Sequence, residues 1–561
     1  MTRTQTYDAA NRLSTIIRAI AGSKYTYDTL SRLSKLTITR NDADMVTTDL
    51  TYKAGGNSCT TSGQIATWKN SRYNNLGDGS LVGATTYSYT YDGRGNITAI
   101  SDGTDTTAYV YDAKGQLTRE NNQAANKTWV YTYDNGGNIT SKTEYAYTTG
   151  TPGSPTSTKS YTYGDTSWKD LLTGYDGATL TYDTIGNLTS DGTWSYTWQH
   201  GRQLASAGNG TKSLTYAYNA DGRRISKTYV NGENTTEARY YYAGNQLSKM
   251  TRGDKTLVFT YDSLGPRSVV YNGSNYYYLR NAQGDVLGIV NAYGAVVASY
   301  TYDAWGNVLS VSGSMSGTLG TLNPLRYRGY VYDTETKLYY LNSRYYNPAT
   351  GRFINADIFV STGQGTLGSN MYAYCGNNPV NKSDPSGALA NWIIGGLIGG
   401  LVGGISAAFQ GKDVFAGAMQ GAVSGAIAGA AVDAALAIVA TGGVAGVAIA
   451  AGVAFVGGFA GNIAGEQAHS LVSEGRFARV DNKMLKRSAI AGGLNVISLG
   501  ISSHLKYCDE GFSGFNRVMK PTEILKDVKK NIFDHSIKAI DASSASATLN
   551  IAIVGSFMLS A

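Results

Sequence analysis

Residues 86–98 read TYSYTYDGRGNIT. Over the first six of these residues tyrosine alternates with serine or threonine, and this period of two predicts a β-strand with its tyrosines on one face. The next five, Asp92 to Asn96, supply the aspartate, glycine and asparagine that favour a reversal of the chain. Ile97 then begins a second strand, so the stretch predicts one β-hairpin.

The same unit recurs through the first two thirds of the chain. It consists of Tyr-Asp, two or three residues, Gly followed by Asn or Arg, and an aliphatic residue; copies or partial copies begin at Tyr7, Tyr27, Tyr91, Tyr111, Tyr133, Tyr182, Tyr218, Tyr261 and Tyr302. One hairpin cannot bury its own face and must stack on its neighbours. We therefore expect one long antiparallel sheet that winds on itself.

Two features of the repeat have alternative interpretations. Tyrosine outnumbers phenylalanine 43 to 12, which favours aromatic packing across strands, although such rings also form platforms for carbohydrate. Asn96, Asn138 and Asn187 each match the pattern for N-glycosylation. Because all three recur at the turn of the repeat, the chemistry of the turn explains them better.

The composition excludes several classes of site. Net charge is +7 over 561 residues without runs of Lys or Arg, so no nucleic-acid surface is predicted. The cysteines Cys59, Cys375 and Cys508 are far apart in sequence, and their spacing predicts neither a disulfide framework nor a structural metal site. No cofactor motif is present.

The composition changes sharply near residue 388. Residues 388–465 are almost uncharged, with glycines at four-residue spacing such as Gly421, Gly425 and Gly429. That spacing puts small residues on one helical face and is typical of helix packing in membranes. We expect a Gly-rich helical segment that inserts into or crosses a membrane; a soluble helical hairpin or a shielded cargo is the alternative.

Residues 466–561 form a tail of mixed charge. His504 and Cys508 are one helical turn apart, which suits a nucleophile and its base, but an ordinary thiol is the simpler interpretation. The tail contains no recognisable enzymatic motif, and its activity is not predicted.

The Tyr-Asp units resemble the YD repeats of RHS (rearrangement hot spot) and wall-associated polymorphic toxins. The resemblance is strongest over residues 276–387, which look like the RHS repeat-associated core; the motifs that carry it are YYYLRNAQGD (276–285), YDAWGN (302–307), PLRYRGY (324–330), LYYLNSRYYNP (338–348), GRFI (351–354), YAYCGNNPVN (372–381) and DPSG (384–387). The family implies a β-spiral shell over residues 1–275 and a core over residues 276–387. The core plugs the shell, and the C-terminal part of the chain is the enclosed cargo.

The family also implies self-cleavage by two aspartates, which map to Asp357 and Asp384. The second aspartate begins the cleavage motif with Pro385, Ser386 and Gly387. Ala388 occupies the position of the motif's leucine and Leu389 follows it, so the cut falls within Ala388, Leu389 and Ala390 or does not occur.

The proposed chemistry is that of an aspartic protease. Two adjacent carboxylates share a proton; one then activates water while the other protonates the peptide. Arg352 is the candidate for orienting a carboxylate through a forked hydrogen bond. Without the resemblance, Asp384-Pro385-Ser386-Gly387 is a type I turn, Asp357 a surface acid, and Arg352 a structural partner of an aspartate or a tyrosine.

These features predict part of an RHS-type toxin whose core releases a C-terminal effector. The chain opens inside a repeat and has no apolar signal region at its N-terminus, so we expect further repeats upstream. The resemblance implies that the full-length protein is secreted or lies at the cell surface. The expected partners are its own cargo, a membrane through residues 388–465, a cell-surface carbohydrate and a cognate immunity protein. The alternatives are a surface protein that binds carbohydrate without cleavage, and a pore-forming effector acting through residues 388–465.

Overall fold

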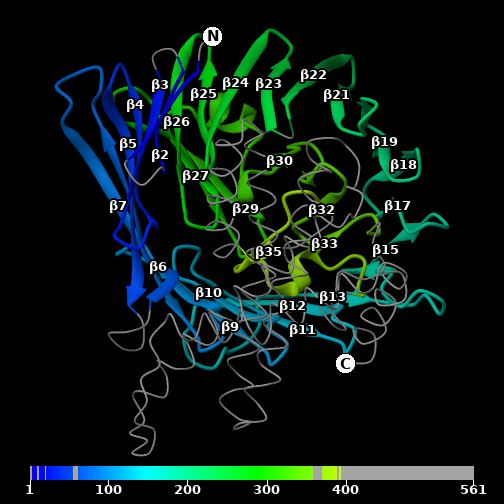
Figure 1. Cartoon of the computed structure of the whole chain (residues 1–561). Helices are drawn as coiled ribbons and strands as arrows, with labels where there is room; N and C mark the ends of the chain where they lie inside the picture. Colours follow the sequence, from blue (N-terminus) through cyan, green and yellow to red (C-terminus); the bar gives the residue numbers. More distant parts are fainter. Residues whose placement is uncertain are drawn as a thin grey trace, which may run out of the picture. The chain divides into compact units, whose positions relative to one another are not determined.

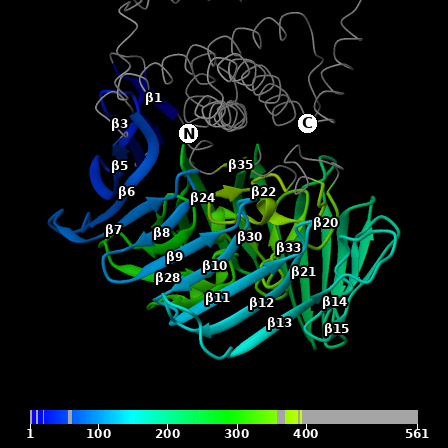
Figure 2. The same cartoon turned by 90° about the horizontal axis from the view of Figure 1, so that it is seen from below.

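The protein consists mainly of antiparallel strands. The computed structural model describes residues 3–8, 12–18, 21–54, 61–244, 246–357, 369–387 and 391–392. Within these ranges the strands of the two large sheets pair with their neighbours in sequence, as Figures 1 and 2 show. The prediction of a mainly β chain built from antiparallel hairpins is confirmed.

The described residues form two large sheets. The first has 15 strands in sequence order: β1 (Arg3–Tyr7), β2 (Leu13–Arg18), β3 (Ala21–Tyr27), β4 (Leu33–Arg40), β5 (Ala43–Ala54), β6 (Thr61–Tyr73), β7 (Leu81–Tyr91), β8 (Ile97–Ser101), β9 (Thr106–Tyr111), β10 (Leu117–Asn122), β11 (Lys127–Tyr133), β12 (Ile139–Ala146), β13 (Ser157–Thr162), β14 (Gly174–Tyr175) and β15 (Ala178–Thr179). The second has 14: β16 (Thr181–Tyr182), β17 (Leu188–Ser190), β18 (Ser195–Gln199), β19 (Gln203–Gly208), β20 (Lys212–Tyr218), β21 (Arg224–Asn231), β22 (Asn234–Ala243), β23 (Gln246–Arg252), β24 (Lys255–Asp262), β25 (Gly265–Tyr271), β26 (Ser274–Arg280), β27 (Val286–Val290), β28 (Val296–Tyr302) and β29 (Val308–Ser312).

This arrangement differs from the single continuous sheet expected from the repeats. The break lies at Leu180, between β15 and β16, where the flanking strands are only two residues long. The Leu180 side chain is buried, and its N–H bonds to the Thr173 carbonyl at 2.9 Å. The chain therefore turns inward here instead of continuing the ladder.

The turn between β7 and β8 shows how the repeat folds. One Asp92 carboxylate oxygen accepts the N–H groups of Arg94 and Asn96, at 2.9 and 2.8 Å. The other oxygen accepts the Asn96 amide at 2.8 Å. Gly95 has a φ of +86°, a conformation that glycine adopts without strain. The aspartate thus ties the whole turn together.

The repeat tyrosine joins each hairpin to an earlier one. The Tyr91 hydroxyl donates to the Ile65 carbonyl at 2.7 Å. In seven other places a tyrosine hydroxyl donates in the same way to the backbone carbonyl of an aliphatic residue in the preceding unit. The pairs are Tyr27 to Leu13, Tyr52 to Leu33, Tyr111 to Ile97, Tyr133 to Leu117, Tyr218 to Leu204, Tyr261 to Leu247 and Tyr302 to Val286. These bonds give each hairpin a specific link to its neighbour.

The repeat asparagines belong to the turns. Asn96, Asn138 and Asn187 are buried, and each amide donates to the aspartate four residues earlier. Their burial and bonding support the turn interpretation over glycosylation.

The residues after β29 form a compact core segment. It contains the short helical turns η1 (Ser316–Gly320), η2 (Tyr327–Gly329) and η3 (Tyr374–Asn377), the four-stranded sheet β30 (Val331–Tyr332), β31 (Tyr339–Tyr340), β32 (Tyr345–Asn347) and β33 (Arg352–Phe353), and the pair β34 (Lys382–Ser383) and β35 (Asn391–Trp392). In Figures 1 and 2, β30 and β33 lie among strands of the two large sheets.

Buried ion pairs and tyrosines fix the core segment to the repeats. Asp333 is buried and accepts from Arg224 of β21 at 2.5 and 3.0 Å and from Lys227 at 3.0 Å. The rings of Tyr216 on β20 and Tyr345 on β32 have centroids 6.0 Å apart, and both residues belong to the same buried apolar cluster. The repeat strands and the core segment thus share one continuous interior.

Among the described residues no helix is long and apolar enough to cross a membrane. The predicted helical segment 388–465 lies outside the described residues except for β35, and the tail 466–561 lies wholly outside them.

Candidate functional site

The structure brings Asp357 and Asp384 to one guanidinium group. Arg344 Nη2 lies 2.8 Å from Asp357 Oδ2 and 3.2 Å from Asp384 Oδ2. The two oxygens therefore lie no farther apart than the sum of these distances. All three side chains are nearly inaccessible to solvent. Two carboxylates that are 27 positions apart in sequence share one buried cation.

Each aspartate is held by the backbone that carries it. Asp357 follows β33, and its N–H bonds to the Met371 carbonyl at 3.0 Å. The carbonyl of the preceding residue, Ala356, accepts from Arg202 in the β18–β19 turn. Asp384 follows β34, and its N–H bonds to the Tyr330 hydroxyl at 2.7 Å. The backbone at Asp357 is therefore fixed by a repeat turn and by the core segment, and the backbone at Asp384 is fixed by the core segment.

The predicted cleavage motif docks along the segment that carries Arg344. Asn342 donates to the Pro385 carbonyl at 3.0 Å, and Ser343 donates to the Ser386 carbonyl at 2.7 Å. Arg344 Nε donates to the Gly387 carbonyl. Three consecutive carbonyls of the motif are thus bonded by three consecutive side chains, so the motif is fixed along this segment.

Gly387 is required by this docking. Its φ is +73°, and a Cβ there would lie 2.6 Å from the Leu341 carbonyl oxygen. Any other residue would suffer both backbone strain and a clash with backbone. The Asp384-Pro385-Ser386-Gly387 turn interpretation and the substrate interpretation are therefore compatible, because the turn itself is bound.

Burial dominates the electrostatics of the site. It lowers the pKa of Arg344, and the carboxylates of Asp384 and Asp357 act in the opposite direction. Burial likewise raises the pKa of Cys375, helped by the negative charge of Asp384, and raises that of Tyr330 well above its ordinary value. The thiol and the phenol beside Asp384 therefore stay neutral and add no negative charge to the site.

Arg352 lies elsewhere. Its guanidinium donates to the Asn138 side chain at 3.0 Å and to the Asp170 carbonyl at 2.6 Å, and it packs over the ring of Tyr163. These contacts match the structural role left open from the sequence. The arginine that contacts the carboxylates of Asp357 and Asp384 is Arg344.

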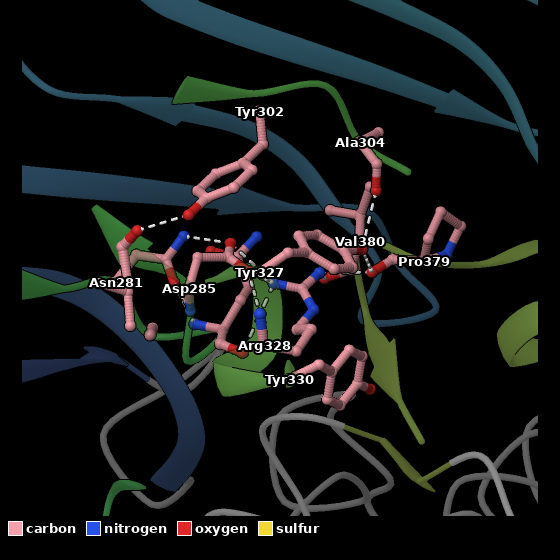
Figure 3. Close-up of polar contacts among 12 residues, drawn as sticks. Asn281, Asp285, Tyr302, Ala304, Tyr327, Arg328, Tyr330, Pro379 and Val380 are labelled. Carbon is pink, nitrogen blue, oxygen red and sulfur yellow. Dashed lines mark hydrogen bonds and ion pairs between the residues drawn. The ribbon is translucent and has the colours of Figure 1, made fainter. Parts of the chain in front are cut away.

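A second buried arginine anchors the segment that leads to Asp384 (Figure 3). Arg328 contacts both oxygens of Asp285 at 2.9 Å and donates to the Pro379 carbonyl. The Tyr327 hydroxyl bonds to the carbonyls of Ala304 and Pro379, at 2.9 and 3.2 Å. Burial opposes the charge of Arg328, but Asp285 raises its pKa overall. The chain is thus fixed five residues before Asp384.

The predicted cleavage residues Ala388, Leu389 and Ala390 lie outside the described residues. In the part of the chain that the structure describes, no group of three or more His, Cys, Asp or Glu side chains could hold a metal ion. Cys375 is buried as a free thiol.

Comparison with known proteins places this arrangement in a family. The family model described as Teneurin YD-shell matches residues 84–380, more than half of the chain. The chain belongs to the teneurin YD-shell family. The matched range includes both the repeat hairpins and most of the core segment, so the YD-shell assignment covers Asp357 and Arg344 and ends four residues before Asp384.

Relatives of this YD-shell chain include bacterial tRNA nucleases. It is 39% identical over 230 residues to the tRNA3(Ser)-specific nuclease WapA of Bacillus spizizenii, and 38% identical over 230 residues to the tRNA nuclease WapA of Bacillus subtilis. Each match covers 40% of this chain and 9% of the relative. The chain therefore spans only a small part of the length of these relatives.

The fold has solved counterparts. The crystal structure of TcdB2-TccC3-Cdc42 matches 69% of this chain and 21% of that chain, with a TM-score of 0.50 and 19% sequence identity. At that identity the likeness shows the fold alone, a YD-shell of stacked antiparallel hairpins.

Proposed function

We propose that this chain is the shell-and-core part of a secreted polymorphic toxin and that its core cuts the chain within residues 388–390. The observation that carries the proposal is Arg344: one guanidinium contacts both aspartates and also bonds the carbonyl of Gly387. The toxin assignment is supported by the similarity to the WapA nucleases. The released part is the C-terminal effector, enclosed until then by the repeats.

Charge balance supports an acid–base pair. Two buried carboxylates face one guanidinium, and a net buried charge is costly. Together with Arg344 the pair is neutral when it holds a single proton, the state that an aspartic protease uses. Arg344 fixes the geometry of both carboxylates through charge-assisted hydrogen bonds.

The cleavage step then follows the general acid–base scheme. The ionised carboxylate takes a proton from a water molecule, and the water oxygen bonds to the carbonyl carbon of the scissile peptide. The protonated carboxyl donates its proton to the carbonyl oxygen. When the C–N bond breaks, the carboxyl that took the proton of water gives it to the leaving nitrogen, and the other carboxylate takes back a proton from a hydroxyl of the tetrahedral intermediate as the new carboxyl group forms. No metal ion or cofactor takes part in this scheme.

The proposal is tested by expressing the full chain and resolving it on a denaturing gel. We expect two fragments with a junction within residues 388–390, identified by the mass and the N-terminal sequence of the smaller one. Asp357→Asn and Asp384→Asn should each leave a single full-length band, since the loss of one member of an acid–base pair costs about 100-fold or more in rate.

The matched control is Asp254→Asn, because Asp254 is an exposed aspartate whose ion pair lies at the surface. This variant should be cut as completely as the wild type. A wild-type chain that stays intact, or equal cleavage of all three variants, would remove self-cleavage and leave a repeat protein that does not release its C-terminal part.

A further inference from the structure

Ser386 holds its hydroxyl against the carboxylate of Asp384. Ser386 Oγ lies 3.3 Å from Asp384 Oδ1, and because an ionised carboxylate only accepts, the serine hydroxyl is the donor. Arg344 Nη2 lies 3.2 Å from the other carboxylate oxygen, Oδ2. The two oxygens of Asp384 therefore have donors on different segments, one on the turn that carries the aspartate and one between β31 and β32.

A second donor fixes what a single donor leaves free. The last torsion of an aspartate side chain is broad and roughly two-fold, so a carboxylate held at one oxygen can still rotate about that contact. A donor at the other oxygen restricts this rotation. Because catalytic groups must be held to within about 0.5 Å of their working position, the bond from Ser386 to Asp384 bears directly on the acid–base step.

The backbone that carries this hydroxyl is itself fixed. The Ser386 carbonyl accepts from the Ser343 hydroxyl at 2.7 Å. On one side the ring of Pro385 restricts its own φ, and on the other the Gly387 N–H bonds to the Asp384 carbonyl at 3.4 Å and closes the turn. Little freedom is left for the half-buried Ser386, so its hydroxyl is pre-organised toward the carboxylate.

The other titratable groups at this carboxylate come from elsewhere in the core segment. Arg344 contacts it together with the carboxylate of Asp357. Burial raises the pKa of Tyr330 and of Cys375, so both are neutral, and Lys382 of β34 acts on the Cys375 thiol. Since a serine carries no charge, removing its hydroxyl changes one hydrogen bond and leaves the charges of the site as they are.

We infer that Ser386 is a positioning residue of the self-cleavage, whose hydroxyl orients the Asp384 carboxylate and favours its ionised form. A hydrogen bond donated to the charged form of an acid stabilises that form. The inference rests on the proposed function and adds a residue that acts through Asp384. It gives a task in the reaction to a position that, from the sequence alone, is only part of a turn.

The test measures the rate of cleavage of the full chain against pH. The chain is labelled in a short cell-free synthesis, unfolded in urea before it is cut, and diluted into buffers from acid to alkaline, with products resolved on denaturing gels. Ser386→Ala should be cut about tenfold more slowly, because a misplaced catalytic group loses rate steeply. Its pH–rate profile should also move to higher pH by about one unit, the effect of one charge-assisted hydrogen bond.

Three further variants separate orientation from folding. Ser386→Thr keeps a hydroxyl and should restore the wild-type profile, whereas Ser343→Ala loses only the bond to the Ser386 carbonyl and should slow cleavage without moving the profile. Ser213→Ala, at an exposed serine of β20, controls for refolding and should match the wild type.

If Ser386→Ala keeps the wild-type profile, whatever its rate, Ser386 serves only the turn; the inference is then wrong and the proposed function stands. A shifted profile that Ser386→Thr does not restore, or one that Ser343→Ala or Ser213→Ala shifts equally, also overturns it. A wild type that is never cut removes both proposals.

Discussion

Two kinds of repeat turn differ in the residue four positions after the aspartate, which is arginine in one kind and asparagine in the other. Arg32 closes its own turn, with Nε 2.7 Å from Asp28 Oδ2, and lies over the ring of Tyr52 at 4.2 Å. Asn138 also bonds its aspartate, Asp134, at 2.9 Å. The arginine side chain is 23% exposed, whereas the asparagine is buried.

The two residue types differ in the hydrogen bonds that they can still make outside the turn. An asparagine side chain both donates and accepts, while an arginine only donates. The free oxygen of Asn138 accepts from Arg352 at 3.0 Å and from Asn370 at 2.7 Å. Asn96 likewise accepts from Asn378 at 3.0 Å. The asparagine turns at Asn96 and Asn138 therefore bind the core segment, whereas Arg32 lies over the ring of Tyr52 on β5.

The largest effect on stability is expected for Asn138→Arg. The new guanidinium would meet that of Arg352 inside the protein, and Arg352 would lose a side-chain acceptor. Breaking a buried charged contact costs about 3–5 kcal/mol, so we expect at least that loss in the free energy of unfolding, measured by denaturant titration of the full chain. Asn138→Ala gives a milder loss of about 2–3 kcal/mol and remains measurable if the arginine variant does not fold. Wild-type stability of both would show that asparagine turns do not hold the core.

A second prediction concerns the asparagine turn at Asp303, which faces the first sheet. Glu120 of β10 is buried and accepts the N–H of Ala304 at 2.9 Å. Burial, and then the neighbouring Asp303 carboxylate, raise the pKa of Glu120 to about 8. Lys142 pairs with Asp303 at 2.8 Å and offsets only part of this effect.

The sign of the pH dependence follows from that shift. Between the ordinary glutamate pKa and about 8 the folded chain holds a proton that the unfolded chain has lost, so stability falls as pH rises through this window. Glu120→Gln should remove this slope and raise the free energy of unfolding by about 2 kcal/mol near pH 9, with little change near pH 4. Unfolding curves at several pH values measure it, with the exposed Glu233→Gln as control. If the Glu120→Gln variant keeps the dependence of the free energy of unfolding on pH, that dependence comes from other titratable groups.

The hairpins could be predicted from the sequence because they rest on local chemistry. Period-two tyrosines and Asp-x-x-Gly-Asn turns act within a few residues, as at Asp92 and Asn96. Asp357 and Asp384 were implied by resemblance to a family, and the structure brings both to Arg344.

Arg344 was not predicted as a site residue. It lies in a tyrosine-rich motif and approaches both aspartates only through the tertiary fold. Arg352 is five positions from Asp357 in sequence, but it bonds Asn138 and the Asp170 carbonyl instead. The break at Leu180 was also missed, because nothing local in the repeat pattern marks it.

The gentlest test converts an arginine turn into an asparagine turn. In Arg32→Asn the new amide can still donate to Asp28 Oδ2, as Asn96 does to Asp92, so the turn itself should persist. The chain loses a partly exposed ion pair and the contact with Tyr52, each worth about 0.5–1 kcal/mol at such sites. We expect a loss of about 1 kcal/mol or less in the free energy of unfolding, several times smaller than for the reverse exchange at Asn138. If the two exchanges lower the free energy of unfolding equally, the residue four positions after the aspartate serves only the turn, and other contacts hold the core segment.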